Sequence, residues 1–178
     1  YWSLTGNAGT NPSANFLGTT DNVSLTLRVN NATALRLEPR TDSPNLVGGY
    51  SGNSVTSGAH GAVIGGGGDT TNPHDIQANF AAIGGGAGHT ITATYGVVAG
   101  GLANVVTGAN AAIVGGWNNA TGGEYAFIGA GTGNRSAGYA SVVAGGWSNR
   151  ADDMYATVGG GDHNTARGSY ATVAGGTY

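Results

Sequence analysis

Aliphatic residues return at a fixed spacing of fifteen residues along most of the chain. This column consists of Ile83, Val98, Ile113, Ile128, Val143, Val158 and Val173. Side chains alternate around each of them, and in Tyr155-Ala156-Thr157-Val158 the residues Ala156 and Val158 share one face of a short predicted strand. A repeat of this length has room for two short strands and two tight turns. The pattern therefore predicts an all-β fold, a parallel β-solenoid in which each repeat forms one coil.

Three further columns keep the same period. Asparagine follows the aliphatic residue by six positions, at Asn104, Asn119, Asn134, Asn149 and Asn164. A small pair, usually Gly-Gly, begins two residues after the aliphatic position. An aromatic residue usually lies three residues before the aliphatic position, as Tyr155 does before Val158. We expect the glycines to form turns with positive φ. The asparagines are predicted to form a hydrogen-bonded ladder from coil to coil, and the tyrosines to lie outside.

The repeat begins near residue 44 with longer coils. Leu46 and Ile64 are eighteen residues apart, and Ile64 and Ile83 are nineteen apart, so residues 44–178 are predicted to form about nine coils. The extra residues from about Asp69 to Gln77 should bulge from the rod as a loop, because insertions in solenoids go to the turns. The last residues stop in mid-coil, from which we expect this chain to be a fragment of a longer one.

Residues 1–43 follow a different pattern and are predicted to form a capping module. A polar loop precedes two alternating segments, 24–29 and 33–38, separated by Asn30-Asn31-Ala32, which is typical of a β-hairpin. The apolar positions of the hairpin are Leu25, Leu27, Val29, Leu35 and Leu37. We expect this apolar face either to close the first coil or to join an oligomer interface.

Each coil has a thin interior, which predicts self-association. An alanine, a valine and a second alanine such as Ala166 give little apolar area to offset about 1 to 2 kcal/mol of backbone entropy per residue. The outward position before the aliphatic column is nevertheless apolar in most coils. We predict a homotrimer about an axis parallel to the rod, with an interface that includes Val97, Phe127, Val142, Tyr125, Tyr155 and Tyr170.

Composition excludes several classes of protein. Glycine accounts for 36 of 178 residues, but it does not recur at every third position, which excludes collagen. Charged residues make up 8% of the chain and the net charge is −3, so no basic surface for nucleic acid is expected. Cysteine is absent, which excludes disulfides and thiolate metal sites. No apolar segment approaches the length of a membrane span, so we expect no membrane insertion.

The coils of residues 44–178 resemble the repeat of a known family. The segments Tyr155-Ala-Thr-Val-Gly-Gly-Gly and Asn164-Thr-Ala-Arg-Gly168 resemble the Ser-Val-Ala-Ile-Gly and Ser-x-Ala-x-Gly halves of the YadA-like head repeat of trimeric autotransporter adhesins, with one residue more per coil. The resemblance covers roughly residues 44–178 and implies a left-handed β-roll with three chains that binds matrix proteins or host surfaces. Asparagine in place of serine and the glycine pair depart from the family pattern. Residues 1–43 resemble a module that precedes β-roll repeats in phage tail-fibre-like secreted proteins.

Few residues suggest chemistry. The four histidines, His60, His74, His89 and His163, are interpreted as occupying different repeat positions without a second ligand at a metal-like spacing. His74-Asp75 and Asp152-Asp153 are read as polar surface and turn residues. No catalytic residue, metal ligand or cofactor is predicted, and the chain is expected not to be an enzyme.

Trp117 and Trp147 are the best candidate ligand contacts. Both follow the glycine pair, and two coils separate them by about 9.5 Å, so exposed indoles could stack on successive sugars of a glycan. Packing against a neighbouring subunit is the alternative interpretation.

The leading functional hypothesis is a segment of an extracellular fibre or adhesin on a bacterial surface or a phage virion, with itself and a host glycan or matrix protein as partners. A purely structural filament and a phage tail-fibre shaft remain alternatives. An ice-binding solenoid and a polysaccharide-cleaving β-helix fit less well, because Thr-x-Thr ladders and clustered acids are missing.

Overall fold

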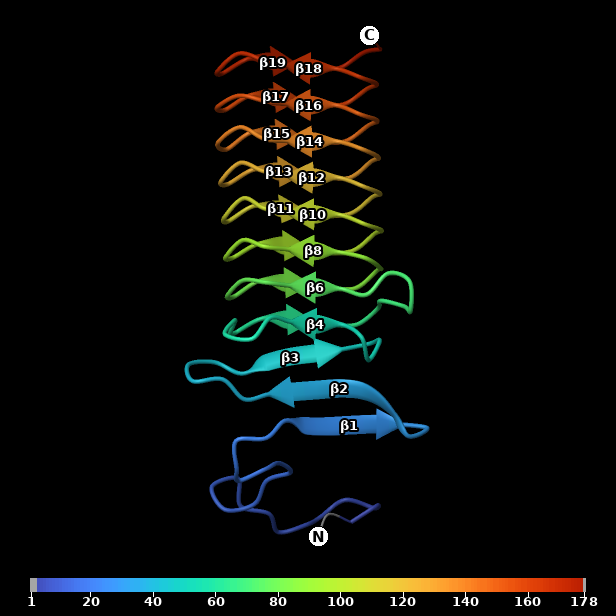
Figure 1. Ribbon diagram of the computed structural model, residues 1–178, viewed down its shortest axis with the longest axis vertical. Coiled ribbons are helices and arrows are strands. Elements are labelled where there is room, and N and C mark those ends of the chain that lie inside the picture. The colour runs from blue at the N-terminus through green and yellow to red at the C-terminus, as the bar shows by residue number, and fades with distance from the viewer. Residues whose placement is uncertain (1–2, 178) are drawn as a thin grey trace.

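The computed structural model describes residues 3–177 and shows a rod of stacked coils (Figure 1). Each regular coil contains one strand of each of two parallel sheets, joined by a turn at either edge of the rod. No helix occurs between residues 3 and 177, and hence none that could span a membrane. The predicted β-solenoid of about nine coils is confirmed. Tyr1, Trp2 and Tyr178 lie outside the described residues, so the first module is described over residues 3–43 only.

Sheet A has eleven strands and runs the length of the rod. Its strands in spatial order are β1 (Leu25–Val29), β2 (Ala32–Glu38), β3 (Asn45–Gly48), β5 (Val63–Ile64), β7 (Ala82–Ile83), β9 (Val97–Val98), β11 (Ala112–Ile113), β13 (Phe127–Ile128), β15 (Val142–Val143), β17 (Thr157–Val158) and β19 (Thr172–Val173). The pairs β1–β2 and β2–β3 are antiparallel, and all later pairs are parallel.

Sheet B has eight strands and covers the other side of the coils. Its strands are β4 (Ser54–Val55), β6 (Asp75–Ile76), β8 (Thr90–Ile91), β10 (Val105–Val106), β12 (Ala120–Thr121), β14 (Arg135–Ser136), β16 (Arg150–Ala151) and β18 (Thr165–Ala166). From β8 onward paired residues are fifteen positions apart, as in Val105 with Ala120. The register of the sheets therefore equals the period of the sequence.

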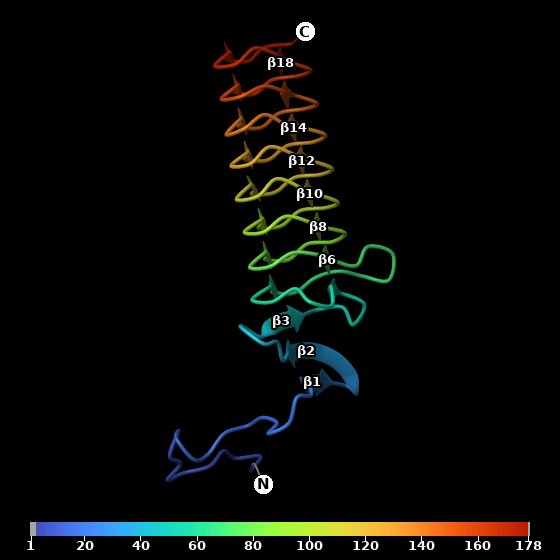
Figure 2. The same ribbon diagram turned by 60° about the vertical axis from the view of Figure 1, so that its left-hand side comes forward.

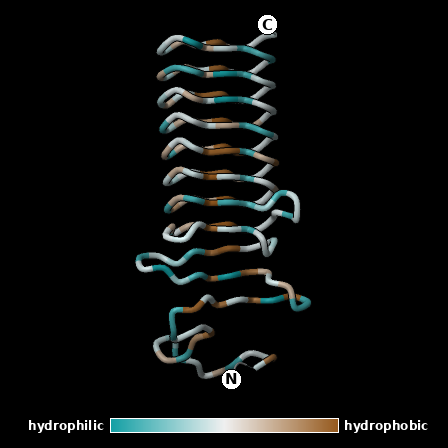
Figure 3. Tube along the Cα trace, viewed as in Figure 1, coloured by the Kyte–Doolittle hydropathy of each residue, from teal (hydrophilic) through white to brown (hydrophobic). Residues whose placement is uncertain are grey.

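The interior consists of one aliphatic and one small column from sheet A and a facing column from sheet B. Ile83, Ile113 and Val158 are completely buried, as is Ala156. Figure 3 shows the resulting apolar segments at the same place in successive coils. A small residue in the sheet A column leaves room for a large residue in the facing column. At Gly96, for example, an added Cβ atom would lie only 2.6 Å from a methyl carbon of Ile91. The core is thin and closely packed.

The second residue of each glycine pair is required by the close approach of the coils. These glycines are Gly86, Gly101, Gly116, Gly131, Gly146 and Gly161, which have positive φ, and a Cβ on any of them would lie 2.0 to 2.3 Å from a carbonyl oxygen of the next coil. The first residue of the pair has open space, as at Gly115, which explains why Ala130 is accepted there.

Glycine is not the only residue with positive φ. The aromatic column also adopts the left-handed conformation, for example at Tyr95 with φ 61° and Tyr155 with φ 56°. A bulky side chain disfavours this region. The corner glycines have positive φ as predicted, and the turn at the tyrosine side adds a non-glycine residue with positive φ in every regular coil.

The five asparagines lie in one column with their side chains at the interior of the glycine turn. Asn119 is representative: its amide nitrogen donates to the carbonyl oxygens of Gly115 (3.1 Å) and Gly131 (2.9 Å), and its Oδ1 accepts the backbone N–H of Asn134 at 2.9 Å. Each side chain thus satisfies polar groups of its own coil and of the following one, which compensates for the small apolar core.

The hairpin extends sheet A rather than covering the end of the first coil with leucines. Leu37 pairs with Leu25 on one side and with Leu46 on the other, so all three share the outward face of the sheet. The inward position is Arg36, whose guanidinium donates to the carbonyl oxygens of Ser51 (3.2 Å) and Asn53 (2.9 Å). The hairpin thus covers the open edge of the first coil by pairing of β2 with β3, while its leucines lie on the outward face of sheet A.

Candidate functional site

The edge of the rod formed by the glycine turns carries both predicted tryptophans. We call the column that follows the glycine pair the tryptophan ridge, and it contains Ala87, Leu102, Trp117, Thr132, Trp147 and Asp162, joined from coil to coil by parallel β-bridges. Trp117 and Trp147 are each 55% exposed. Because Thr132 lies between them, the two indoles are about 9.6 Å apart along the rod at a strand spacing of about 4.8 Å.

The backbone of each tryptophan is hydrogen-bonded to the following coil. The N–H of Trp117 donates to Gly131 at 2.9 Å, and the Trp117 carbonyl accepts the N–H of Gly133 at 2.9 Å. The indole of Trp147 contacts the ring of His163 edge-on at 5.2 Å between centroids, and His163 in turn bonds Asp162. The second indole therefore has a fixed aromatic neighbour.

The inserted loop lies at the same edge of the rod, where it projects before β6 (Figures 1 and 2). Asn72 accepts the N–H of Gly88, the residue after Ala87 of the tryptophan ridge, at 3.0 Å. Within the loop, Asp69 accepts the N–H groups of Thr71 (2.7 Å) and Asn72 (2.8 Å), and these bonds lower the pKa of Asp69. The sequence indicated the loop and the tryptophans separately, and the structure places them on one edge.

An exposed apolar face covers the outside of sheet A. We define the apolar face by Val63, Ala82, Val97, Ala112, Phe127 and Val142, which pair in register from β5 to β15. Val97 is 40% exposed and Phe127 is 37% exposed. Below Val63 the face continues through Leu46 to the leucines of the hairpin. Three of the predicted interface residues therefore lie on one surface.

The remaining predicted interface residues form a ridge at the opposite turn. This tyrosine ridge contains Phe80, Tyr95, Tyr125, Tyr139, Tyr155 and Tyr170, all exposed. Tyr139 contacts Tyr125 and Tyr155 edge-on at 5.5 and 5.6 Å, and Tyr155 stacks on Tyr170 at 5.0 Å. Tyr139 thus fills the position that Ala140 leaves without an aromatic ring. Asn110 interrupts the ridge between Tyr95 and Tyr125.

His74 and His89 do not lie on the surface, and the interpretation of the histidines as unrelated positions is wrong for this pair. Both are completely buried and continue the asparagine column, with their rings stacked at 5.0 Å. The Nδ1 atoms accept backbone N–H groups of the next coil, from His89 at 3.2 Å and Asn104 at 3.1 Å. Each Nε2 therefore carries the proton.

The inserted loop is also shorter than predicted, since β6 begins at Asp75.

The environment of this pair opposes a positive charge. Burial lowers the pKa of both rings, and the charge of its neighbour His74 contributes at His89, whose pKa falls to about 4. The Nε2 atoms face glycine carbonyls, Gly85 and Gly101 in the case of His89, but these contacts fall short of hydrogen-bond geometry. The pair is therefore a structural element whose rings are buried in the neutral form, and protonation in acid is unfavourable in the fold.

Two exposed arginines of sheet B form ion pairs with Asp152. Asp152 accepts from Arg135 at 2.9 Å and from Arg150 at 3.2 Å, and Asp153 accepts the N–H of Met154. Among residues 3–177 no group of three histidine, cysteine or acidic side chains lies close enough to hold a metal ion. Asp152 and Asp153 are thus engaged in ion pairs and turn bonds.

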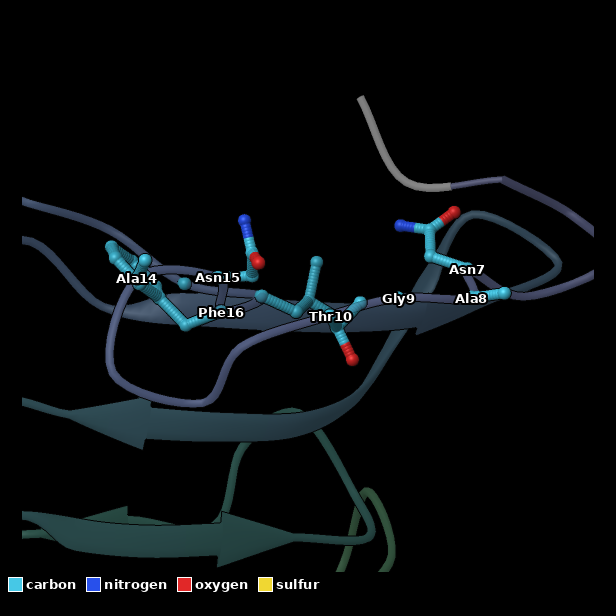
Figure 4. Close-up of a pocket in the computed structure, with 9 residues that line it drawn as sticks. Asn7, Ala8, Gly9, Thr10, Ala14, Asn15 and Phe16 are labelled. Carbon is cyan, nitrogen blue, oxygen red and sulfur yellow. The ribbon is translucent and has the colours of Figure 1, made fainter.

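A pocket of about 500 Å³ lies in the N-terminal loop (Figure 4). Its lining comes from residues 7–18 alone, including Asn7, Thr10, Asn15 and Phe16. None of the lining side chains is titratable, so the pocket offers shape and neutral hydrogen-bonding groups only. It is remote from both ridges, which belong to the coils.

Comparison with known proteins gives no relative from which a role could be transferred. No protein-family model, curated protein or solved structure matches the chain.

Proposed function

We propose that this chain is a non-enzymatic segment of a trimeric extracellular fibre or adhesin, which mediates attachment or projects a binding tip from a bacterial or phage surface. The observation that carries the proposal is the apolar face of sheet A. It runs without interruption from the hairpin through Val63, Val97 and Phe127 to Val142. The tandem repeat supports an elongated role, because each coil adds length to the rod.

The size of the apolar face supports burial against another chain. The nine strands of sheet A from β1 to β15 carry the apolar face, and at a spacing of about 4.8 Å they make it about 40 Å tall. A width of four residue intervals along the strand direction is about 13 Å, which gives an area of about 520 Å². Contiguous apolar patches of several hundred Å² are often interaction sites, and this area is about two thirds of the roughly 800 Å² per partner of a stable interface.

Cyclic symmetry about an axis parallel to the rod fits this face. Such an axis places the same residue of each chain at the same height, so Phe127 meets Phe127 and Val97 meets Val97. A perpendicular two-fold axis would instead oppose the hairpin of one chain to the last coils of the other, where Thr157 and Thr172 replace the apolar residues. The preference for three chains, and for a left-handed roll, follows the resemblance to YadA-like heads.

The test is the native mass measured by light scattering after size exclusion over a range of concentrations. We expect three times the 17.4 kDa of the chain. The double variant Val97→Lys, Phe127→Lys should be monomeric, because it places two like charges per chain at the shared axis. The matched control Thr92→Lys, on the exposed side of the coil beyond sheet B, should keep the mass of the wild type. A monomeric wild type, or a double variant that still associates, would refute the proposal.

A further inference from the structure

The tryptophan ridge combines aromatic and polar groups along one edge of the rod. Trp117 and Trp147 point from equivalent positions two coils apart, and the intervening Thr132 has no side-chain hydrogen-bond partner within the described residues. Asp162 follows Trp147 in the same column. Two flat apolar surfaces thus alternate with groups that donate or accept hydrogen bonds along the rod axis.

The ridge is preorganised, which lowers the entropy lost when a ligand binds. Backbone bonds to the following coil fix both tryptophans, since the N–H of Trp117 donates to Gly131 and that of Trp147 donates to Gly161, each at 2.9 Å. The edge-on contact with His163 restrains the second indole further. A tryptophan has only two side-chain torsions, so little additional ordering is needed at either platform.

The charge of the ridge restricts the ligand. No lysine or arginine occurs among its residues, and its one ionisable residue is Asp162, which is hydrogen-bonded to His163. The nearby Arg135 and Arg150 are held by Asp152. An anionic ligand would meet a carboxylate without a free cation, whereas a neutral polyhydroxylated ligand would find both acceptors and apolar platforms.

We propose that the tryptophan ridge binds a neutral polysaccharide chain that lies parallel to the rod, with sugar rings stacked on Trp117 and Trp147 and hydroxyl groups bonded to Thr132 and Asp162. The apolar C–H face of a pyranose matches the negative face of an indole, and its hydroxyls match the polar residues between the platforms. This inference rests on the proposed function in one respect: association through the apolar face leaves the glycine-turn edge open to solvent.

The experiment titrates the full chain with cellohexaose, chitohexaose and mannohexaose, and with a hyaluronan hexasaccharide as the anionic comparison. Binding is measured by calorimetry, and the indole N–H signals in NMR spectra report contact at each tryptophan. We expect at least one neutral hexasaccharide to bind and to shift the signals of Trp117 and Trp147. Each of Trp117→Ala and Trp147→Ala should weaken binding about three- to tenfold, since one aromatic contact is lost. The double variant should show no measurable binding.

The control variant Tyr95→Ala removes an aromatic ring of nearly equal exposure, 53%, from the opposite edge and should bind like the wild type. Light scattering on every variant separates this inference from the proposed function, because loss of the tryptophans should leave the native mass unchanged. The proposal is overturned if no neutral hexasaccharide binds, if hyaluronan binds more tightly, or if the double tryptophan variant binds as well as the wild type. A tryptophan variant with a reduced native mass would also overturn it, since the ridge would then be a subunit interface.

Discussion

Replacing Asn134 by alanine tests whether the buried ladder stabilises the coils. Asn134 is 1% exposed, and its amide nitrogen donates to the carbonyl oxygens of Ala130 (3.1 Å) and Gly146 (2.9 Å). Its Oδ1 accepts the backbone N–H of Asn149 at 2.9 Å. Alanine removes all three bonds without altering the backbone of the turn, so the measured change reports on the side chain.

The three lost bonds differ in cost. The N–H of Asn149 loses its only acceptor and stays buried, which costs about 1 to 3 kcal/mol. The Gly146 carbonyl keeps a bond from Thr132 at 3.0 Å, and Ala130 is exposed and accessible to water, so each of these losses costs about 1 kcal/mol. We therefore expect Asn134→Ala to lower the free energy of unfolding by about 3 to 5 kcal/mol.

The assay is guanidinium denaturation followed by far-UV circular dichroism, with amide exchange to locate the loss in the coils next to Asn134. Asn134→Asp keeps the acceptor for Asn149 but places a carboxylate before two carbonyl oxygens, so we expect it to destabilise at least as much as alanine. Thr92→Ala, an exposed site without a side-chain hydrogen bond, should change stability by less than about 0.5 kcal/mol. A loss below about 1 kcal/mol for Asn134→Ala, or wild-type stability for Asn134→Asp, would show that the ladder contributes little.

Three further predictions concern other parts of the rod. The pKa of His89 is about 4 in the fold and about 6.5 in the unfolded chain. This group should therefore not lower the free energy of unfolding above pH 6.5, but should lower it by roughly 2 to 3 kcal/mol as the pH drops to 4. The double variant His74→Asn, His89→Asn should abolish this loss in acid titrations of unfolding. Gly131→Ala should destabilise by about 3 kcal/mol or more in denaturant titration, because its Cβ would lie 2.1 Å from a carbonyl oxygen, whereas Gly115→Ala should change stability by no more than about 1 kcal/mol; equal effects would contradict the close-approach explanation. Arg36→Ala should raise amide exchange in the hairpin before the coils, since its guanidinium links β2 to the first coil, and unchanged exchange would show that strand pairing alone holds the hairpin.

The period of the sequence was sufficient to predict the coils but not the residues that replace the consensus. Val98, Val143 and their equivalents identify the strands because each must fill the same narrow interior. The two buried histidines were missed because the ladder was defined by asparagine alone. His74, His89 and Asn104 are spaced by fifteen residues, and this spacing was the available signal. An imidazole Nδ1 and an amide Oδ1 accept the same backbone N–H, which is why two different residue types share one column.

The direction of the hairpin could not be derived from the sequence. Alternation shows that Leu35 and Leu37 share a face, but it does not say whether that face meets the core or continues the outside of sheet A. The choice depends on the register of β2 with β3, where Leu37 opposes the outward Leu46 and Arg36 opposes the buried Val47. Long-range pairing of this kind leaves no mark within either segment alone.

Some columns of the rod are constrained by the packing of the coils, whereas others are exposed and free to vary. Residue variation in the exposed columns can therefore indicate where a ligand binds. Interior positions accept only a narrow range of sizes, and the second glycine of each pair accepts no side chain at all. The tryptophan ridge, by contrast, accommodates alanine, leucine, tryptophan, threonine and aspartate on the same backbone. Since the fold requires no particular residue there, two exposed tryptophans are not needed to build the coils, and an exposed indole gains nothing from the hydrophobic effect until something covers it. Residues that depart from the repeat at unconstrained positions are therefore where a ligand of this rod should be sought first.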